Sequence, residues 1–438
     1  MTIWMNWTWV YEGVRSMDNR TRFGWNNAYS YIMGIKDAYV AKFGQMDTYS
    51  CIEMAQRLQT DEYSNFLRCT DIHVCGALNG FKYSLIKGGK TDLYANPDSI
   101  YREMRGLVIN METEEIVVAP FRKFFNINEI PETSLNVVTR EIQAADMVEI
   151  TNKLDGSMVS VRWYDGQIFL AGTGCIDKSI SFRLQEAEGW MTAGHQRMLR
   201  EHPDMTFIFE YISWNDKHVV EYTEQEQDIY LIGARDILTG RLAPYRELEE
   251  YAKQYDVPIT AFEGNSLDEC LQQRERIPAN QKEGWVLYLH TAAGTSMYKL
   301  KCTDYLDLHA VLSRYASPDA VIKAIARGTF DDLLAKMPMS CHERLQKIFD
   351  MVQRYLQLKN DKIESAYASL ASITDLREFA AKVYSTVDKT IAHYMFLKRK
   401  GLSYNLLETK PEHFLKFREV EEFLKSAEEA DGGIDENR

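Results

Sequence analysis

Lys153 stands in a short polar stretch in which a lysine, an aspartate and a glycine are closely spaced. Residues 151–157 read TNKLDGS. A lysine amine attacks a phosphorus atom only after losing its proton, and its ordinary pKa is about 10.4, which nearby cations lower. The stretch is also a good turn, and Lys-x-Asp-Gly arises by chance about 0.1 times in a chain of this length. Taken alone, the stretch can be interpreted either as an ordinary turn or as the site of a lysine nucleophile.

Two acidic residues stand at the ends of apolar segments further along the chain. Glu210 follows the run MTFIF, and Glu283 precedes GWVLYLH. Each is by itself an ordinary solvated strand end. Taken as a pair, the two carboxylates could hold the hydroxyl groups of a ribose and a hard cation such as Mg²⁺.

Four basic residues complete the set. Lys299 and Lys301 fall on one face of a predicted strand, because side chains alternate along a strand with a period of two. Arg105 and Lys123 lie upstream, in EMRGLVI and FRKFFNINE. Taken singly, Lys299 and Lys301 fit a solvent-exposed strand face, Arg105 fits a turn, and Lys123 fits a lysine whose amine extends to solvent. Together they could neutralise a triphosphate and lower the pKa of Lys153.

The motifs occur in a recognisable order. Lys-x-Asp-Gly-Ser, Phe-Glu-Tyr, Glu-Gly-Trp-Val and Lys-x-Lys resemble those of the covalent nucleotidyltransferases, which are the DNA ligases, RNA ligases and capping enzymes. The set looks most like the phage-type RNA ligase 1 family. Further likenesses lie at 105–107, 123–129 and 299–309, and the similarity covers roughly residues 75–335.

The resemblance implies a role for each matching position. Lys153 would be the nucleophile that takes AMP from ATP, and Ser157 would hydrogen-bond locally. Nucleotide contacts are implied for Tyr83, Arg105, Lys123, Glu210 (ribose), Ile232 and Val286 (adenine), and Lys299 and Lys301 (α-phosphate). Glu283 and Asp331 would support a metal ion. Asp155 would orient metal-bound water, and Tyr305 would be needed for activity.

Two segments depart from the family pattern. Trp214, in SWNDKHVV, stands where relatives often carry a proline, and residues 171–174 read AGTG where relatives often show basic residues. Both departures concern contacts with the substrate more than the transfer of AMP to the lysine.

The activity implied by the resemblance is that of an ATP-dependent RNA ligase with Mg²⁺ or Mn²⁺ as its metal ion. Its substrate would be RNA with 5′-phosphate and 3′-hydroxyl ends, and nicked tRNA is the expectation by analogy. One alternative is a DNA ligase or capping enzyme, which usually carries an oligonucleotide-binding barrel where this chain turns helical. Another is a catalytically inactive RNA-binding relative.

The patterns predict an α+β fold: a nucleotidyltransferase domain with antiparallel sheets, then an all-helical C-terminal domain. Alternating residues around Asp165-Gly166 predict a β-hairpin. One helical segment is expected at 180–202 and another near RELEEYAKQY. We expect an N-terminal extension over 1–60, the nucleotidyltransferase domain over 61–312, helices over 313–428 and a disordered acidic tail over 429–438.

In the C-terminal part, Ser317-Pro318 predicts the start of a helix and Gly328 its end. Further helices are expected over 342–358 and, as one helix, over 376–401. The basic run at 398–400 could contact RNA, although such a run is more often a solvated helix end.

The overall composition sets limits on the class of protein. The 438 residues are 45% hydrophobic and carry a net charge of −13, so a polyanion would need a local basic site rather than a basic coat. No apolar stretch approaches the ~18 residues of a membrane span. Seven cysteines without paired spacing predict a reduced, cytoplasmic protein. The oligomeric state is not predicted.

Overall fold

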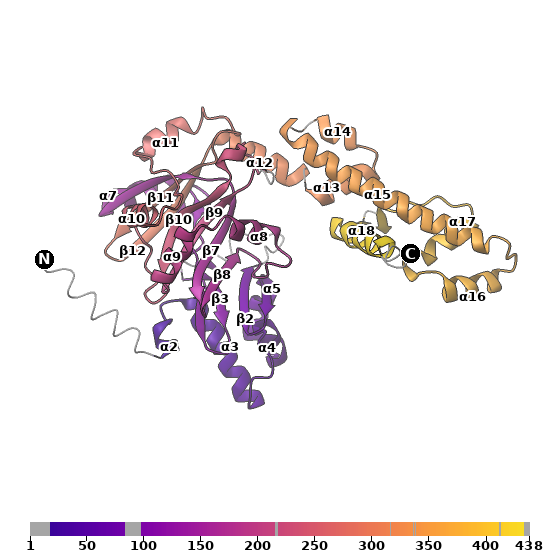
Figure 1. The fold of residues 1–438 in the computed structure, drawn as a ribbon, viewed down its shortest axis with the longest axis horizontal. Helices are drawn as coiled ribbons and strands as arrows, with labels where there is room; N and C mark the ends of the chain where they lie inside the picture. Colours follow the sequence, from indigo (N-terminus) through magenta and orange to yellow (C-terminus); the bar gives the residue numbers. More distant parts are fainter. Residues whose placement is uncertain are drawn as a thin grey trace. The chain divides into compact units, whose positions relative to one another are not determined.

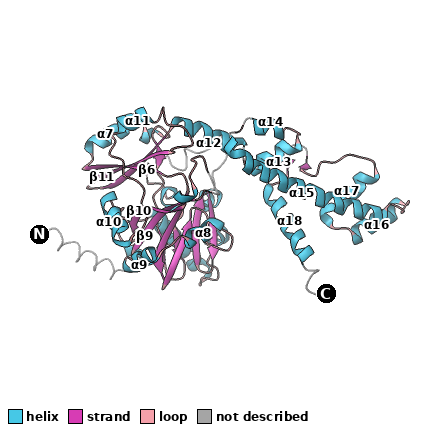
Figure 2. Ribbon diagram, turned by 45° about the horizontal axis from the view of Figure 1, so that its top comes forward, coloured by secondary structure: helices cyan, strands magenta, loops and turns pink. Residues whose placement is uncertain are grey.

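The computed structural model describes residues 18–83, 98–214, 218–315, 317–335, 337, 339–410 and 413–432. The chain divides into two compact units, Met1–Leu306 and Asp307–Arg438. The first combines antiparallel sheets with helices, and the second is mainly helical (Figures 1 and 2). The predicted mixture of antiparallel sheets followed by C-terminal helices is therefore confirmed.

The described residues of the first unit form three four-stranded sheets. The N-terminal sheet has the order β1-β2-β3-β4, with strands Thr70–Cys75, Leu78–Tyr83, Val108–Asn110 and Glu115–Val118. The hairpin sheet has the order β10-β9-β7-β8, with strands Asp228–Asp236, Met205–Ile212, Ser157–Tyr164 and Gln167–Gly172. The lysine sheet has the order β5-β12-β11-β6, with strands Phe125–Asn126, Gly294–Lys301, Gly284–Thr291 and Met147–Lys153. All strand pairs are antiparallel except β12 with β5, which is parallel.

The predicted hairpin is β7-β8. Its two turn residues, Asp165 and Gly166, have φ values of 50° and 75°. Positive φ at both central positions is the conformation whose twist suits a two-residue hairpin, and Asp-Gly tolerates it. The turn fixes the register that pairs Tyr164 with Gln167.

The helices of the first unit cover these sheets. They are α2 (Asn19–Arg22), α3 (Asn27–Phe43), α4 (Cys51–Leu58), α5 (Ser64–Cys69), α6 (Tyr101–Met104), α7 (Leu135–Ala144), α8 (Phe182–Gly189), α9 (Ala193–Glu201), α10 (Tyr245–Tyr255) and α11 (Leu267–Gln273). Helices α3 and α4 lie beside the N-terminal sheet (Figure 1) and share a core with it, in which Tyr29 and Ile32 pack with Phe81 and Ile109. The described part of the N-terminal segment is therefore built into the first unit.

The helical segment expected at 180–202 is confirmed, and the structure divides it into two helices. Helix α8 ends at Gly189, and α9 begins at Ala193. The side chain of Thr192 accepts a hydrogen bond from the backbone N–H of His195 and so caps α9. This N-cap starts a new helix within what reads as one continuous pattern.

The second unit holds α13 (Pro318–Ala326), α14 (Phe330–Ala335), α15 (Met339–Leu370), α16 (Leu376–Thr386), α17 (Lys389–Arg399) and α18 (Phe417–Gly432). Helix α12 (Thr303–Tyr315) runs across the division. The expected cap is present, since Ser317 accepts a hydrogen bond from Ala320 N at 3.2 Å. None of the helices in the described ranges is long and apolar enough to cross a membrane.

Two expectations for this unit are wrong. It is not all-helical, because β13 (Glu408–Lys410) and β14 (His413–Phe414) pair as a small antiparallel sheet. The single helix expected over 376–401 is two helices. Asp388 interrupts it and accepts a hydrogen bond from Thr390 N at 2.8 Å, which starts α17.

Candidate functional site

A pocket of about 560 Å³ lies where the hairpin sheet meets the lysine sheet. Ligand pockets typically measure about 300–1,000 Å³. Within the described ranges its lining includes six Lys and Arg side chains but a single carboxylate, that of Glu210. The pocket is therefore strongly cationic in a chain whose net charge is −13, and it suits a polyanion.

The register of the lysine sheet brings the two lysine motifs to one carboxylate. On the central strand β11, Gly284 pairs with Lys153 of β6 on one side and with Lys301 of β12 on the other. Glu283 directly precedes it, and its Oε2 lies 2.8 Å from Lys153 Nζ while its Oε1 lies 2.8 Å from Lys301 Nζ. Glu283 is buried and bridges the two lysines.

Gly284 is required for this bridge. Its φ is 148°, and an added Cβ would lie 2.0 Å from Leu300 O, inside the backbone of the neighbouring strand. Only glycine accepts both the conformation and the close approach. The Glu-Gly pair is thus explained by the way β11 and β12 come together.

The expectation that cations lower the pKa of Lys153 is wrong in this structure. Burial lowers that pKa, but the charges of Glu283 and Glu210 outweigh burial and raise it. The lysine whose pKa is lowered is Lys299 instead. Burial, followed by the charges of Lys123 and Lys153, holds the pKa of Lys299 well below its usual value. The reason is proximity, because Lys153 makes its closest contact with a carboxylate, whereas cations face Lys299.

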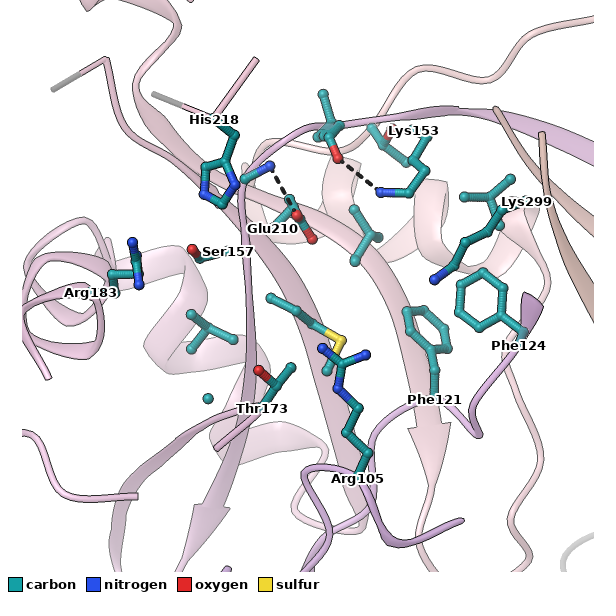
Figure 3. Close-up of a pocket in the computed structure, with 18 of the residues that line it drawn as sticks. Arg105, Phe121, Phe124, Lys153, Ser157, Thr173, Arg183, Glu210, His218 and Lys299 are labelled. Carbon is teal, nitrogen blue, oxygen red and sulfur yellow. Dashed lines mark hydrogen bonds between the residues drawn. The ribbon is translucent and has the colours of Figure 1, made fainter. Parts of the chain in front are cut away.

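Glu210 is the carboxylate inside the pocket. It lies on β9, and its Oε1 accepts a hydrogen bond from Gly156 N at 3.1 Å (Figure 3). Burial raises the pKa of Glu210 to about 7, and the charge of Lys153 opposes this shift. A Cβ on Gly156 would lie 2.3 Å from Tyr211 O, so this glycine allows the lysine turn to approach β9.

The apolar part of the pocket is formed by Ile232 and Val286, together with Tyr288. Ile232 falls in a β-bulge of β10, where the register with β9 shifts between Leu231 and Gly233. A bulge re-aims a side chain. Tyr288 donates a hydrogen bond to Ile232 O at 3.2 Å and holds the bulge. Walls of this kind suit a flat aromatic base.

Asp155 acts as an anchor in this structure. Its Oδ2 accepts hydrogen bonds from Val219 N at 2.8 Å and Val220 N at 2.9 Å, and its Oδ1 accepts one from Tyr305 OH at 2.7 Å. Its own backbone N–H donates to Tyr222 OH at 2.9 Å. The side chain is buried and does not line the pocket. This geometry does not support the expected role of orienting metal-bound water, and it gives Tyr305 a physical role.

The remaining predicted residues fall into three groups. Arg105, Lys123 and Ser157 line the pocket, and Lys123 Nζ lies 4.9 Å from the ring centre of Phe125. Tyr83 ends β2, but its side chain lies outside the described residues. Asp331 is exposed on α14 in the second unit, and its predicted role stays a prediction.

Several residues of the pocket were not predicted. They include Phe121, Phe124, Asn152, Thr173, Arg183, His218 and Tyr288. Asn152 directly precedes Lys153, and its buried side-chain oxygen has no hydrogen-bond partner within the described ranges. A donor such as the amino group of a base would satisfy it. His218 and Thr173 belong to the two segments that depart from the family pattern.

Two side chains of the basic run at 398–400 make contacts within the second unit. Lys398 pairs with Glu364, and Arg399 donates hydrogen bonds to Ile373 O at 2.7 Å and Thr374 O at 2.6 Å. These contacts tie the end of α17 to neighbouring segments, so the run resembles a structural helix end.

Residues 103–305 match the model of a family described as RNA ligase, of the phage T4 RNA ligase 1 type. This region is therefore similar to the RNA ligase family. The matched region contains Lys153, Glu210, Glu283 and both lysines of β12.

Curated relatives share limited identity with this chain. The "Putative bifunctional polynucleotide kinase/RNA ligase" of Autographa californica nuclear polyhedrosis virus is 26% identical over 254 residues, which cover 54% of this chain and 35% of the relative. The "Putative RNA ligase" of Thermovibrio ammonificans is 30% identical over 144 residues, which cover 32% of this chain and 35% of the relative. The chain spans about a third of the length of these relatives.

Solved structures show a weaker likeness. An archaeal ATP-dependent RNA ligase is 15% identical, with a TM-score of 0.43 over 82% of this chain and 100% of that one. An RNA ligase of Naegleria gruberi, solved with ATP and Mn, is 20% identical, with a TM-score of 0.33 over 40% of this chain and 56% of that one. TM-scores this low do not by themselves establish a shared fold.

Proposed function

We propose that the protein is an ATP-dependent RNA ligase of the covalent nucleotidyltransferase type. The observation that carries this proposal is Lys153 at the wall of a cationic pocket, bridged through Glu283 to Lys301. The apolar walls at Ile232 and Val286 would take adenine, and the unpartnered Asn152 oxygen would accept a hydrogen bond from its amino group.

In the first step, Lys153 Nζ attacks the α-phosphorus of ATP. An N–P bond forms, the P–O bond to pyrophosphate breaks, and the proton on Nζ passes to a carboxylate or water. The pair with Glu283 keeps Nζ protonated before ATP arrives, so nucleotide binding must loosen this pair. Cations from Lys299, Lys123 and Arg105 would then face the phosphates and stabilise the charge that develops on them.

The carboxylates near Lys153 suit the expected metal ion, but the described residues offer it few protein ligands. Carboxylate oxygens suit Mg²⁺ or Mn²⁺, and Glu210 and Glu283 present them beside Lys153. However, no group of three or more His, Cys, Asp or Glu side chains suited to a metal is found within the described ranges. When bound together with ATP, the ion would add positive charge to the phosphates. Because protein ligands are few, we infer that ATP would supply much of its coordination.

The second and third steps complete the reaction. AMP passes from Lys153 to the 5′-phosphate of an RNA, and an RNA 3′-hydroxyl then displaces AMP to form the phosphodiester bond. We propose RNA with 5′-phosphate and 3′-hydroxyl ends as the substrate, with nicked tRNA as its natural form, and the cytoplasm as the place of action. The second unit would contribute to the choice of RNA.

The test is covalent labelling with ATP that carries a radioactive α-phosphate, in the presence of Mg²⁺. The wild-type protein should become labelled, and Lys153→Ala should not. Lys178→Ala is a suitable control, because Lys178 is a surface lysine paired with Glu188 and does not line the pocket. An unlabelled wild-type protein that still binds RNA would show a catalytically inactive relative. A labelled protein that seals DNA nicks and not RNA would show a DNA ligase.

A further inference from the structure

The pocket extends beyond the residues assigned to ATP. Its far end is lined by Thr173, Gly174 and Ser181 of the segment that joins β8 to α8, by Arg183 in the first turn of α8, and by His218. In Figure 3, His218, Ser157 and Arg183 lie on one side of Glu210, whereas Lys153, Lys299 and Phe124 lie on the other. The far end is therefore separate from the lysine cluster, yet it belongs to the same cavity.

This end is cationic and carries no carboxylate among the described residues that line it. Arg183 and His218 supply donors from α8 and from the loop after β9. A third basic residue joins them from another sheet, since a Cβ built on Gly174 would lie 2.8 Å from Lys82 Cδ. The side chain of Lys82 thus packs against Gly174, which lines the far end, although Lys82 itself is not part of the pocket lining. Basic residues from three segments therefore lie at the far end or next to it.

Exposed apolar side chains stand next to Arg183. Ile180 and Phe182, which alternate with Ser181 and Arg183, are 69% and 50% exposed. Arg183 Cζ lies 4.9 Å from the ring centre of Phe182. An exposed aromatic ring next to an arginine is a platform on which an unpaired base can stack while its phosphate meets the cation.

We propose that the α8 face, defined as Lys82, Thr173, Ser181, Phe182, Arg183 and His218, binds the 5′-phosphate end of the RNA that receives AMP. This inference rests on the proposed ligase function and names the site of one of its substrates.

The chemistry of AMP transfer favours this occupant over the 3′-hydroxyl strand. An oxygen of the RNA 5′-phosphate attacks the phosphorus of lysyl-AMP, the P–N bond to Lys153 breaks, and Nζ takes back a proton. For an in-line displacement the nucleophile must approach from the side away from Lys153. That nucleophile carries close to two negative charges, whereas a 3′-hydroxyl carries none. An end across the pocket from Lys153 that is lined by Arg183, and by no carboxylate among the described residues, fits the phosphate.

The test uses full-length protein that has first been converted to lysyl-AMP and freed of ATP. Single-turnover transfer of AMP to an RNA oligonucleotide with a 5′-phosphate is measured at rising RNA concentration. Arg183→Ala and Lys82→Ala should each lower kcat/KM for transfer by about tenfold or more, the loss expected for a charged hydrogen bond to phosphate. Phe182→Ala should act mainly on KM, and Phe182→Tyr should restore it because the ring is kept. Lys178→Ala, next to the α8 face but paired with Glu188, should stay within about twofold of wild type.

The outcomes separate this inference from the proposed function. A wild-type protein that forms no lysyl-AMP would overturn the ligase proposal itself. If lysyl-AMP forms but the Arg183 and Lys82 variants slow its formation from ATP as much as they slow transfer to RNA, the α8 face serves the ATP phosphates and the inference is wrong. It is also wrong if transfer is unaffected, or if these variants weaken only the 3′-hydroxyl strand in the sealing of pre-adenylylated RNA.

Discussion

The hydrogen bond between Asp155 and Tyr305 offers a sharp test of how the lysine turn is held. Both side chains are buried, and Tyr305 OH lies 2.7 Å from Asp155 Oδ1. A hydrogen bond to a charged group contributes about 1.5–3 kcal/mol, and leaving its partner unsatisfied costs a similar amount. We therefore expect Tyr305→Phe to lower the free energy of unfolding of the first unit by about 2 kcal/mol.

Substitutions at Asp155 should follow the number of hydrogen bonds that each one removes. Asp155→Ala leaves Val219 N, Val220 N and Tyr305 OH without their acceptor, and we expect a loss of about 4 kcal/mol. Asp155→Asn can keep its carbonyl toward the two backbone N–H groups, so a loss of about 2 kcal/mol is expected. Combining it with Tyr305→Phe should cost less than the sum, because both changes remove the same hydrogen bond.

The assay is urea unfolding followed by fluorescence, run alongside lysyl-AMP formation at rising Mg²⁺ concentration. An anchor affects stability and the rate, but the Mg²⁺ concentration for half-maximal rate should stay within about twofold of wild type, since Asp155 faces protein donors and not the pocket. The anchor interpretation is refuted if both variants are as stable as wild type and Asp155→Asn only raises the Mg²⁺ requirement.

Four more predictions concern the pocket and the second unit. Lys153→Ala should abolish lysyl-AMP formation but still seal RNA that already carries 5′-AMP, because that step needs no lysine nucleophile. Lys301→Ala should destabilise the first unit by about 3 kcal/mol, because it leaves one oxygen of buried Glu283 without its partner, and Lys301→Arg should restore stability more than rate. ATP affinity should rise about tenfold from pH 6 to pH 8 if the carboxylate form of Glu210 binds ribose, since its pKa is about 7, and Glu210→Gln should flatten this rise. A fragment of residues 1–316 should still form lysyl-AMP but lose preference between a nicked tRNA stem-loop and an unstructured strand.

Each of these has a clear contrary result. If Lys153→Ala joined RNA with ATP at the wild-type rate, Lys153 would not be the nucleophile. Unchanged stability and rate in Lys301→Ala would show that its contact with Glu283 contributes nothing. A wild-type pH dependence in Glu210→Gln would assign the titration to another group. Equal rate ratios on the two RNAs for the fragment and the full chain would show that the second unit does not choose the substrate.

The pH dependence of stability has a definite sign for Glu210. Its pKa is about 7 in the folded protein and about 4.5 when unfolded, so folding favours the protonated form. This contribution to stability is fully present below pH ~4.5 and is lost as the pH rises through 7. A bound nucleotide should therefore stabilise the protein more at pH 8 than at pH 6, which thermal unfolding with and without ATP would measure.

Local features were readable from the sequence because they depend on neighbours in the chain. The turn at Asp165-Gly166 and the cap at Ser317 rest on the conformations that these residues adopt within a few positions. Two helix breaks were missed for the same local reason. Thr192 and Asp388 are caps that look like ordinary polar positions inside a longer apolar pattern.

The sequence by itself determined which chemical groups the protein has. Lys153, Glu210, Glu283 and the lysines of β12 could be named from residue type and spacing, and the family match to residues 103–305 contains them. Only the tertiary structure decided which charged side chains come into contact with one another. Glu283 lies 130 positions from Lys153 in sequence, yet their atoms come within 2.8 Å because β11 pairs with β6.

That pairing reverses the expected electrostatics. A pKa depends on burial and on the distance to each charge, and neither can be read from spacing along the chain. The carboxylate therefore reaches Lys153 and raises its pKa, while the lysines crowd Lys299 and lower its pKa instead. Likewise, Asp155 reads as a reactive group in the sequence and becomes an anchor in the fold, because Tyr305 and the backbone at 219–220 reach its oxygens first.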